Sequence, residues 1–92
     1  MSTGTQPKPT QEEIAQAIQA FLMQNRPKDV ASIGLDDDLF QKGIMDSLQI
    51  VGTVAFIESK FQCSLDFEDL TETNLKSVNA MVQLLSRKIG SK

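Results

Sequence analysis

The chain has 92 residues, enough for one small domain and too few for two. It contains no histidine, no tryptophan, no tyrosine and a single cysteine. Without histidine it cannot build a Ser-His-Asp or Cys-His catalytic group, and it lacks the ligands for a tetrahedral zinc site. We therefore expect a protein that is not an enzyme and that holds no catalytic or structural metal.

The composition also bears on where the chain works. There is no apolar run of roughly eighteen residues that would span a membrane. The first six residues do not place a basic segment before an apolar one, so no signal peptide is expected. A single cysteine forms no internal disulfide, which is typical of the reducing cytosol. These features predict a cytoplasmic monomer with no membrane span.

The net charge of −3 hides an acidic middle. Between Asp29 and Glu72 lie ten acids and only two bases, which leaves a charge of −8 on that stretch. Such a stretch repels the phosphates of nucleic acids and attracts basic protein surfaces. We expect protein partners and no nucleic acid, although ordinary solvated carboxylates give the same composition.

The N-terminal part divides into a tail and a first helix. Residues 1–9 are polar and contain two prolines, so a disordered tail is expected there and a folded domain over residues 10–90. Thr10 and Glu13 have the spacing of a capping box. Apolar residues then recur at helical spacing and predict an amphipathic helix that ends near Asn25, two residues before a proline.

A loop of about eighteen residues follows, from Lys28 to Asp46, which is longer than most connections in a compact domain. Its apolar residues are scattered among acids and glycines. They predict that the loop folds against the core, and we expect Phe40 to be its buried anchor.

A second helix is predicted from Ser47 to Phe61 or Gln62, with Asp46 as its N-cap. Its inner face carries four apolar residues at helical spacing: Ile50, Val54, Ile57 and Phe61. A second face carries three more: Leu48, Val51 and Ala55. This second face is either exposed for partner proteins or part of a helix that is buried nearly all round.

Two further helical segments are predicted. A short turn over residues 66–70 has three apolar contacts: Leu65, Phe67 and Leu70. The last helix runs from about Ser77 to Ile89. No alternating strand pattern is present, so the expected fold is all-α: a four-helix bundle with three main helices, a short third helix and a long first loop.

Ser47 stands at the first position of the second helix, directly after the glycine-containing loop. A phosphate attached to its hydroxyl would lie close to the free N–H groups and the positive dipole end of the helix. The simpler interpretation is that Asp46 and Ser47 only cap the helix. These two residues alone favour the cap.

The segment DDLFQKGIMDSL, residues 37–48, resembles the phosphopantetheine attachment region of acyl and peptidyl carrier proteins. Those proteins carry a Gly-x-x-Asp-Ser-Leu motif after a D-x-L-F segment, and here the motif spans residues 43–48. The similarity continues through the second helix to residues 68–70 and Ser77, and it covers about residues 11–89.

This resemblance implies an acyl carrier protein. Ser47 would take a 4′-phosphopantetheine arm from coenzyme A, transferred by a phosphopantetheinyl transferase, the holo-synthase. The thiol of the arm would carry an acyl or aminoacyl group as a thioester. Asp46 would orient the loop and the transferase complex, and Leu48, Val51 and Ala55 would face partners. The implied partners are the transferase, a ligase that loads the acyl or aminoacyl group, and condensing or acyl-transferring enzymes.

The second helix departs from that of fatty-acid carriers, which is usually strongly acidic. Glu58 is its only acid after Ser47, which favours a dedicated biosynthetic pathway over general fatty-acid synthesis. Gly52 inside this helix lowers the stability of the helix by about 1 kcal/mol relative to alanine. It serves either the close approach of a partner or internal packing.

Cys63 lies between apolar residues and is expected to be a small buried residue rather than a reactive thiol.

Two other functions are compatible with parts of the sequence. One is a helical interaction domain without a prosthetic group, in which Ser47 is only a cap. The other is a calcium-binding protein, suggested by three consecutive aspartates at residues 36–38. An EF-hand loop that starts at Asp38 fails, because three required ligand positions are occupied by other residues: Phe40, Lys42 and Gln49.

Overall fold

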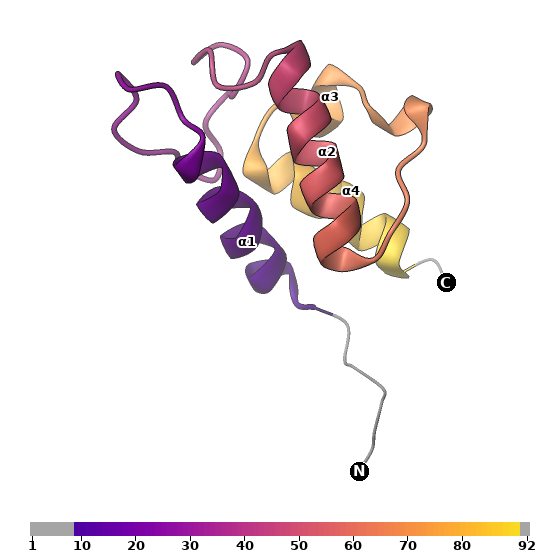
Figure 1. Ribbon diagram of the computed structural model, residues 1–92. Helices are drawn as coiled ribbons and strands as arrows, with labels where there is room; N and C mark the ends of the chain where they lie inside the picture. The colour runs from indigo at the N-terminus through magenta and orange to yellow at the C-terminus, as the bar shows by residue number, and fades with distance from the viewer. Residues whose placement is uncertain (1–8, 91–92) are drawn as a thin grey trace.

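The computed structural model describes residues 9–90, and the tail expected over residues 1–9 lies outside the described residues except for Pro9. Five helical elements follow one another in the described part of the chain, without a strand (Figure 1). They are α1 (Gln11–Gln24), α2 (Ser47–Phe61), the 3-10 turn η1 (Phe67–Asp69), α3 (Glu72–Leu75) and α4 (Val78–Gly90). The all-α carrier-type bundle expected from the sequence is confirmed.

Helix α1 begins at the predicted capping box. The Glu13 N–H donates to Thr10 Oγ1 at 3.1 Å, and the Thr10 N–H donates to Glu13 Oε1 at 2.9 Å. The helix ends where expected, since the N–H of its C-cap Asn25 donates to the carbonyl of Leu22 at 3.1 Å. Both ends are therefore determined by contacts between residues close together in the chain.

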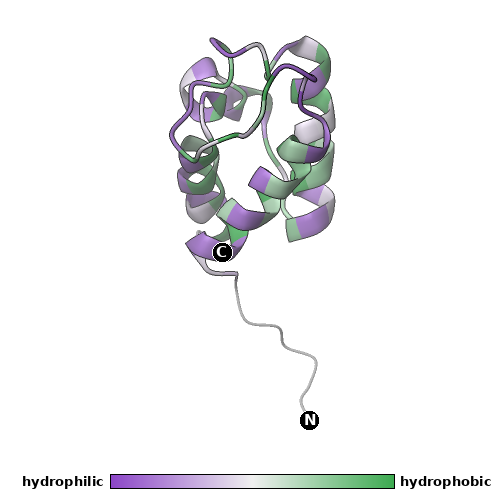
Figure 2. Cartoon of the chain, turned by 90° about the vertical axis from the view of Figure 1, so that its left-hand side faces the viewer, coloured by the Kyte–Doolittle hydropathy of each residue, from purple (hydrophilic) through white to green (hydrophobic). Residues whose placement is uncertain are grey.

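The core lies where α1, α4 and the inner face of α2 meet, and the long loop also contributes to it. Figure 2 shows hydrophobic and hydrophilic residues interspersed along the helices, as expected of amphipathic helices. The rings of Phe21 on α1 and Phe56 on α2 stack with their centroids 4.4 Å apart. None of the helices in the described part of the chain is long and apolar enough to cross a membrane.

The inner face of α2 follows the predicted stripe only in part. Ile57 is buried as expected, but the second buried residue of the helix is Thr53, while Ile50, Val54 and Phe61 are half-buried. Thr53 Oγ1 accepts a hydrogen bond from Gln49 Nε2 at 3.2 Å. This bond satisfies the buried hydroxyl, so a polar residue can occupy a core position.

The prediction that Phe40 is the buried anchor of the long loop is wrong in its extent, because Phe40 packs against the core but is not buried in it. Leu39 is fully buried and Phe40 is only half-buried. The Leu39 N–H donates to the Lys76 carbonyl at 2.7 Å, and the Leu39 carbonyl accepts from the N–H groups of Ile44 and Met45 at 2.9 and 3.0 Å. Adjacent side chains in a turn point in different directions, and the backbone bonds of Leu39 hold its side chain in the core.

The segment after α2 contains two short helical elements where one was predicted. η1 forms at the predicted turn, whereas α3 was missed because four residues are too few to show helical periodicity. Phe67 was predicted to be an apolar contact, and this is wrong, because its side chain is 90% exposed. In a 3-10 turn, residues three apart share a side, so Asp66 and Asp69 lie together on the side that pairs with Lys88, and Phe67 lies on another side.

Candidate functional site

The start of α2 presents a serine hydroxyl that the fold does not use. Ser47 is the exposed first residue of the helix, and its hydroxyl makes no hydrogen bond within the described residues. The cap comes from Asp46, whose Oδ1 accepts from the Gln49 N–H at 2.8 Å. Since Asp46 alone closes the helix end, the Ser47 hydroxyl is available for chemistry.

Backbone N–H groups next to Ser47 are also available. The first intrahelical bond of α2 is donated by the Ile50 N–H to the Asp46 carbonyl at 2.8 Å. The N–H groups of Ser47 and Leu48 precede this bond and have no acceptor in the described part of the chain. With the helix dipole they favour negative charge, so a phosphodiester on the Ser47 oxygen fits this position.

The loop before Ser47 holds the serine in a defined place. Asp38 Oδ1 accepts from the N–H groups of Phe40 and Gln41, each at 3.1 Å, and Gly43 completes the turn with a φ of 75°. Ile44 and Met45 are then buried in the core. The chain thus leaves the core directly before Asp46, and this fixes where the serine emerges.

The three consecutive aspartates of the loop have structural partners. Asp36 Oδ1 accepts from Asn79 Nδ2 at 2.7 Å, and Asp37 Oδ2 accepts from the Gly34 N–H at 2.6 Å. Asp38 caps the turn described above. Among residues 9–90 no group of three or more His, Cys, Asp or Glu side chains is arranged to hold a metal ion. The side chains of these aspartates hold the loop to itself and to α4.

The outer face of α2 carries the apolar strip that the sequence singled out, Leu48, Val51 and Ala55, which we call the outer strip. Leu48 is 81% exposed and Val51 is 66% exposed, and Ala55 is exposed as well. The alternative that α2 is buried nearly all round is therefore wrong. A Cβ added to the nearby Gly52 would meet no atom within 4 Å, so packing inside this chain does not require that glycine.

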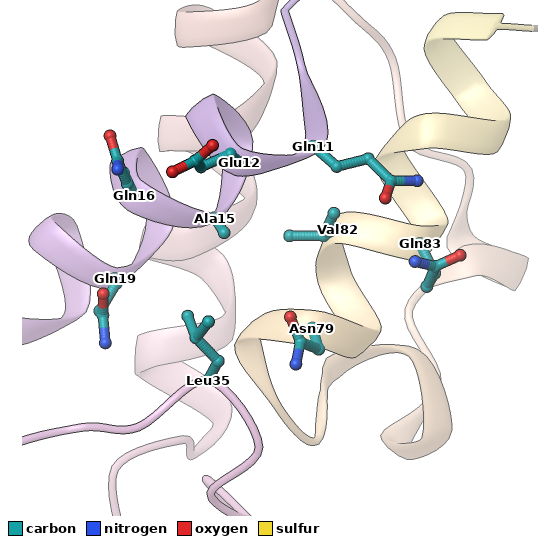
Figure 3. A pocket seen from close by; sticks show the side chains of 9 residues that line it. All are labelled: Gln11, Glu12, Ala15, Gln16, Gln19, Leu35, Asn79, Val82 and Gln83. Atoms are coloured by element: carbon teal, nitrogen blue, oxygen red, sulfur yellow. The ribbon is translucent and has the colours of Figure 1, made fainter.

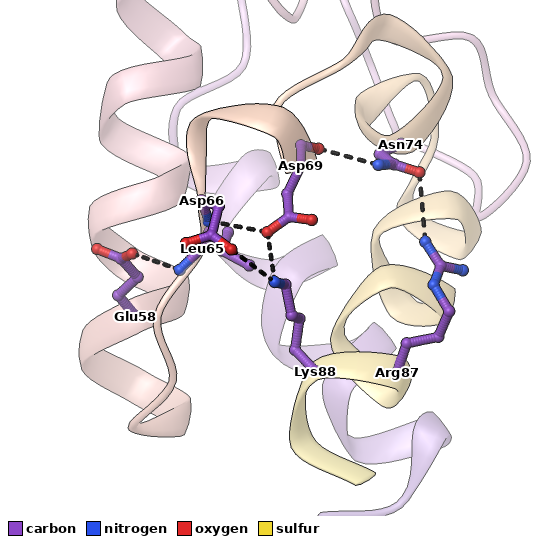
Figure 4. Close-up of polar contacts among 7 residues, drawn as sticks. All are labelled: Glu58, Leu65, Asp66, Asp69, Asn74, Arg87 and Lys88. Carbon is purple, nitrogen blue, oxygen red and sulfur yellow. Dashed lines mark hydrogen bonds and ion pairs between the residues drawn. The ribbon is translucent and has the colours of Figure 1, made fainter. Parts of the chain in front are cut away.

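A polar cluster holds the segment after α2 against both long neighbouring helices (Figure 4). Glu58 Oε2 on α2 accepts from the Leu65 N–H at 2.8 Å. Lys88 Nζ on α4 lies 2.7 Å from Asp69 Oδ2 and 3.3 Å from Asp66 Oδ2, and we call these three residues the Lys88 clamp. The hydrogen bond with Lys88 lowers the pKa of Asp69, and the same bond raises the pKa of Lys88.

Two hollows lie away from Ser47. A groove of about 390 Å³ between α1 and α4 is lined largely by side-chain amides (Figure 3): Gln11, Gln16, Gln19, Asn79 and Gln83. A second hollow, of about 520 Å³, includes Cys63 and Lys88.

Cys63 is half-buried rather than buried, and burial, with the charge of Glu58, raises the pKa of its thiol. A raised pKa keeps the thiol protonated and unreactive at neutral pH.

The structure therefore brings all five residues of the predicted site to the first turns of one helix: Asp46, Ser47, Leu48, Val51 and Ala55.

A protein-family model described as a phosphopantetheine attachment site matches residues 12–85. The matched range includes Ser47 and at least part of every helix. A comparison with curated proteins finds no match.

Proposed function

The chain belongs to the family of phosphopantetheine attachment domains, and from this membership we propose that it is a monomeric acyl or aminoacyl carrier protein modified at Ser47. The family attaches 4′-phosphopantetheine covalently, so the chain is a phosphopantetheine-carrying protein. The observation that most supports Ser47 is its exposed hydroxyl, which takes no part in the cap of α2. The adjacent free N–H groups suit the phosphate of the arm.

When bound, the arm supplies a terminal thiol that carries the acyl or aminoacyl group as a thioester. The residues of the chain have a different task, which is to hold the base of the arm at a fixed point on the surface. Leu39, Ile44 and Met45 anchor the preceding loop in the core, and Asp46 caps the helix. Tethering then raises the concentration of the cargo near a docked enzyme, to the millimolar range for a short flexible link.

We propose that other proteins perform the chemistry. These are the phosphopantetheinyl transferase, a ligase that loads the cargo, and condensing or acyl-transferring enzymes. The outer strip supports this proposal, since it places exposed apolar side chains on the same helix as Ser47. A chain without histidine is suited to carry a substrate rather than to activate it.

The proposal includes a dedicated biosynthetic pathway rather than general fatty-acid synthesis. Glu58 is the only acid in α2, and it is bonded to the Leu65 N–H. Partners of this carrier would therefore bind mainly through contacts with the apolar outer strip, and not through a row of acids on α2. We also place the carrier in the cytosol, where a lone thiol such as Cys63 stays reduced.

The test is the intact mass of the chain after incubation with coenzyme A and a phosphopantetheinyl transferase of broad substrate range. The wild-type chain is expected to gain the mass of one arm, and Ser47→Ala is expected to gain none. Ser47→Ala should keep its circular dichroism spectrum and lose less than about 0.5 kcal/mol of stability, because it removes only a surface hydroxyl.

Ser59→Ala is the matched control, because Ser59 is also an exposed serine of α2. It should take up the arm as the wild type does. Equal labelling of Ser47→Ala and wild type would refute the assignment of Ser47. A wild-type chain that no transferase modifies would favour a helical interaction domain without a prosthetic group.

A further inference from the structure

Phe67 is the most exposed of the large apolar side chains described in the structure, at 90%. The outer strip contributes the next two, Leu48 and Val51. Isolated exposed apolar residues are common on protein surfaces, whereas several on one side indicate an interaction site. The position of Phe67 relative to Ser47 therefore decides whether it belongs to the same surface.

The segment that carries Phe67 runs back along α2 toward Ser47 (Figure 1). Leu65 is bonded to Glu58 in the C-terminal half of α2, and Lys76 is bonded to Leu39 in the loop that precedes the helix. Ser47 lies eleven residues before Glu58, about 16 Å along the helix axis. Phe67 follows Leu65 by two residues, and extended chain of that length covers about 7 Å in the direction of Ser47. Measured along the axis of α2, Phe67 is then roughly 10 Å from Ser47.

The backbone that carries Phe67 is held in place by bonds before and after this residue. The Asp66 N–H donates to Asp69 Oδ2 at 2.8 Å, and the Asp69 N–H donates to the Asp66 carbonyl at 2.9 Å. The Lys88 clamp then joins both aspartates to α4. An apolar side chain on a fixed backbone loses little conformational entropy when a partner covers it, which favours binding.

The charge around Phe67 has one sign. From Ser64 to Leu75 the sequence contains four acids and no base. Lys88 pairs with Asp66 and Asp69, while Glu68 and Glu72 are exposed. With the exposed Asp46 beside Ser47, this surface offers apolar side chains among carboxylates. Its complement is an apolar pocket with a rim of lysine or arginine side chains.

We propose that Phe67 is a second docking residue, which enters an apolar pocket with a basic rim on the phosphopantetheinyl transferase that modifies this chain; the inference rests on the proposed function. The transferase must bind the phosphate groups of coenzyme A, so cationic side chains surround its active site. A standard interface buries about 800 Å² per partner, a patch roughly 30 Å wide. An enzyme seated over Ser47 is therefore wide enough to reach Phe67 as well.

The test is the steady-state kinetics of arm transfer from coenzyme A, with the chain as varied substrate and the transferase that loads the wild type. Phe67→Ser should raise KM for the chain about tenfold, as expected for an aromatic docking residue, and change kcat less than twofold. Phe67→Leu should recover most of the loss, because it restores an apolar side chain. Glu68→Lys should also raise KM, because it puts a base opposite the basic rim.

Leu35→Ser is the matched control, because Leu35 is an exposed leucine that lines the groove between α1 and α4. Its KM should equal that of the wild type. A second measurement uses Ser47→Ala, which cannot accept the arm, and the double variant that also carries Phe67→Ser. Binding of each chain to the transferase is titrated with coenzyme A present. The double variant should bind about tenfold more weakly than Ser47→Ala.

The outcomes separate the two proposals. If the wild type gains an arm on Ser47 and Phe67→Ser has an unchanged KM, the docking role is wrong and the proposed function stands. If the wild type gains no arm from any transferase, the proposed function fails and this inference fails with it. Equal loss in Phe67→Ser and Phe67→Leu with altered thermal unfolding would mean that Phe67 supports the fold, which also overturns the inference.

Discussion

Leu39 and Phe40 are adjacent in the long loop, yet only Leu39 is fully buried. We expect Leu39→Ala to reduce the free energy of unfolding by about 2–5 kcal/mol, because it leaves a cavity in the core. Phe40→Ala should cost less, since water already reaches part of its ring. Urea unfolding of both variants measures the order, and a larger loss for Phe40→Ala would contradict it.

Gly52 and Gly43 respond differently to the same substitution. A Cβ at Gly52 would meet nothing within 4 Å, and the residue is inside a helix. Gly52→Ala should therefore raise the free energy of unfolding by about 1 kcal/mol. Gly43→Ala is the contrasting variant and should lower it, because the φ of Gly43 is 75°. Thermal unfolding measures both, and a destabilised Gly52→Ala would contradict the open space around Gly52 by showing that the added methyl group clashes within the chain.

At the scale of elements, the Lys88 clamp ties η1 to α4 and gives stability a defined pH dependence. The pKa of Asp69 is lowered from 3.8, so its contribution is complete above pH 3.8 and is lost as the pH falls through the lower folded value. The pKa of Lys88 is raised from 10.5, so its contribution is complete below pH 10.5 and is lost as the pH rises through the higher folded value.

We therefore expect Lys88→Gln to lower the free energy of unfolding by a small, constant amount between pH 3.8 and 10.5. Outside this range the difference from the wild type should shrink. Denaturant unfolding across the pH range measures it. Lys60→Gln is the control, because Lys60 is exposed and has no ion pair within residues 9–90. A pH-independent difference for Lys88→Gln at both extremes would show that the clamp does not act through charge.

For the molecule as a whole, the proposed docking surface combines acidic side chains with the apolar outer strip. Val51 is 66% exposed, so Val51→Glu should leave the domain folded. It should nevertheless impair modification of Ser47 or transfer of cargo, because truncating or charging an apolar anchor typically costs 1–2 kcal/mol or more of binding. Added salt should slow docking of the wild type, whose residues from Asp29 to Glu72 carry a charge of −8.

The Val51→Glu defect should persist at high salt, because it comes from a lost apolar contact. Association rates at low and high salt, measured by stopped flow with the transferase, separate the two effects. Circular dichroism checks the fold. A Val51→Glu chain that unfolds would make Val51 a core residue, and one that is loaded and unloaded at wild-type rates would remove the outer strip from docking.

The sequence by itself determined the three long helices, because their ends depend on neighbours in the chain, whereas the four-residue α3 was missed. Thr10 with Glu13, and Asp46 with Gln49, close helix ends through bonds between residues three apart. The attachment motif is also local, and it predicted both the family and Ser47. The family is confirmed, while the role of Ser47 stays a prediction.

Only the tertiary structure decided which apolar side chains are covered. Leu39 rather than Phe40 enters the core because its backbone pairs with Lys76, a residue far along the chain. Phe67 is left outside the core, in a turn whose two aspartates, Asp66 and Asp69, pair with Lys88 of α4. Burial depends on where distant elements meet, and neither hydropathy nor spacing along the chain contains that information.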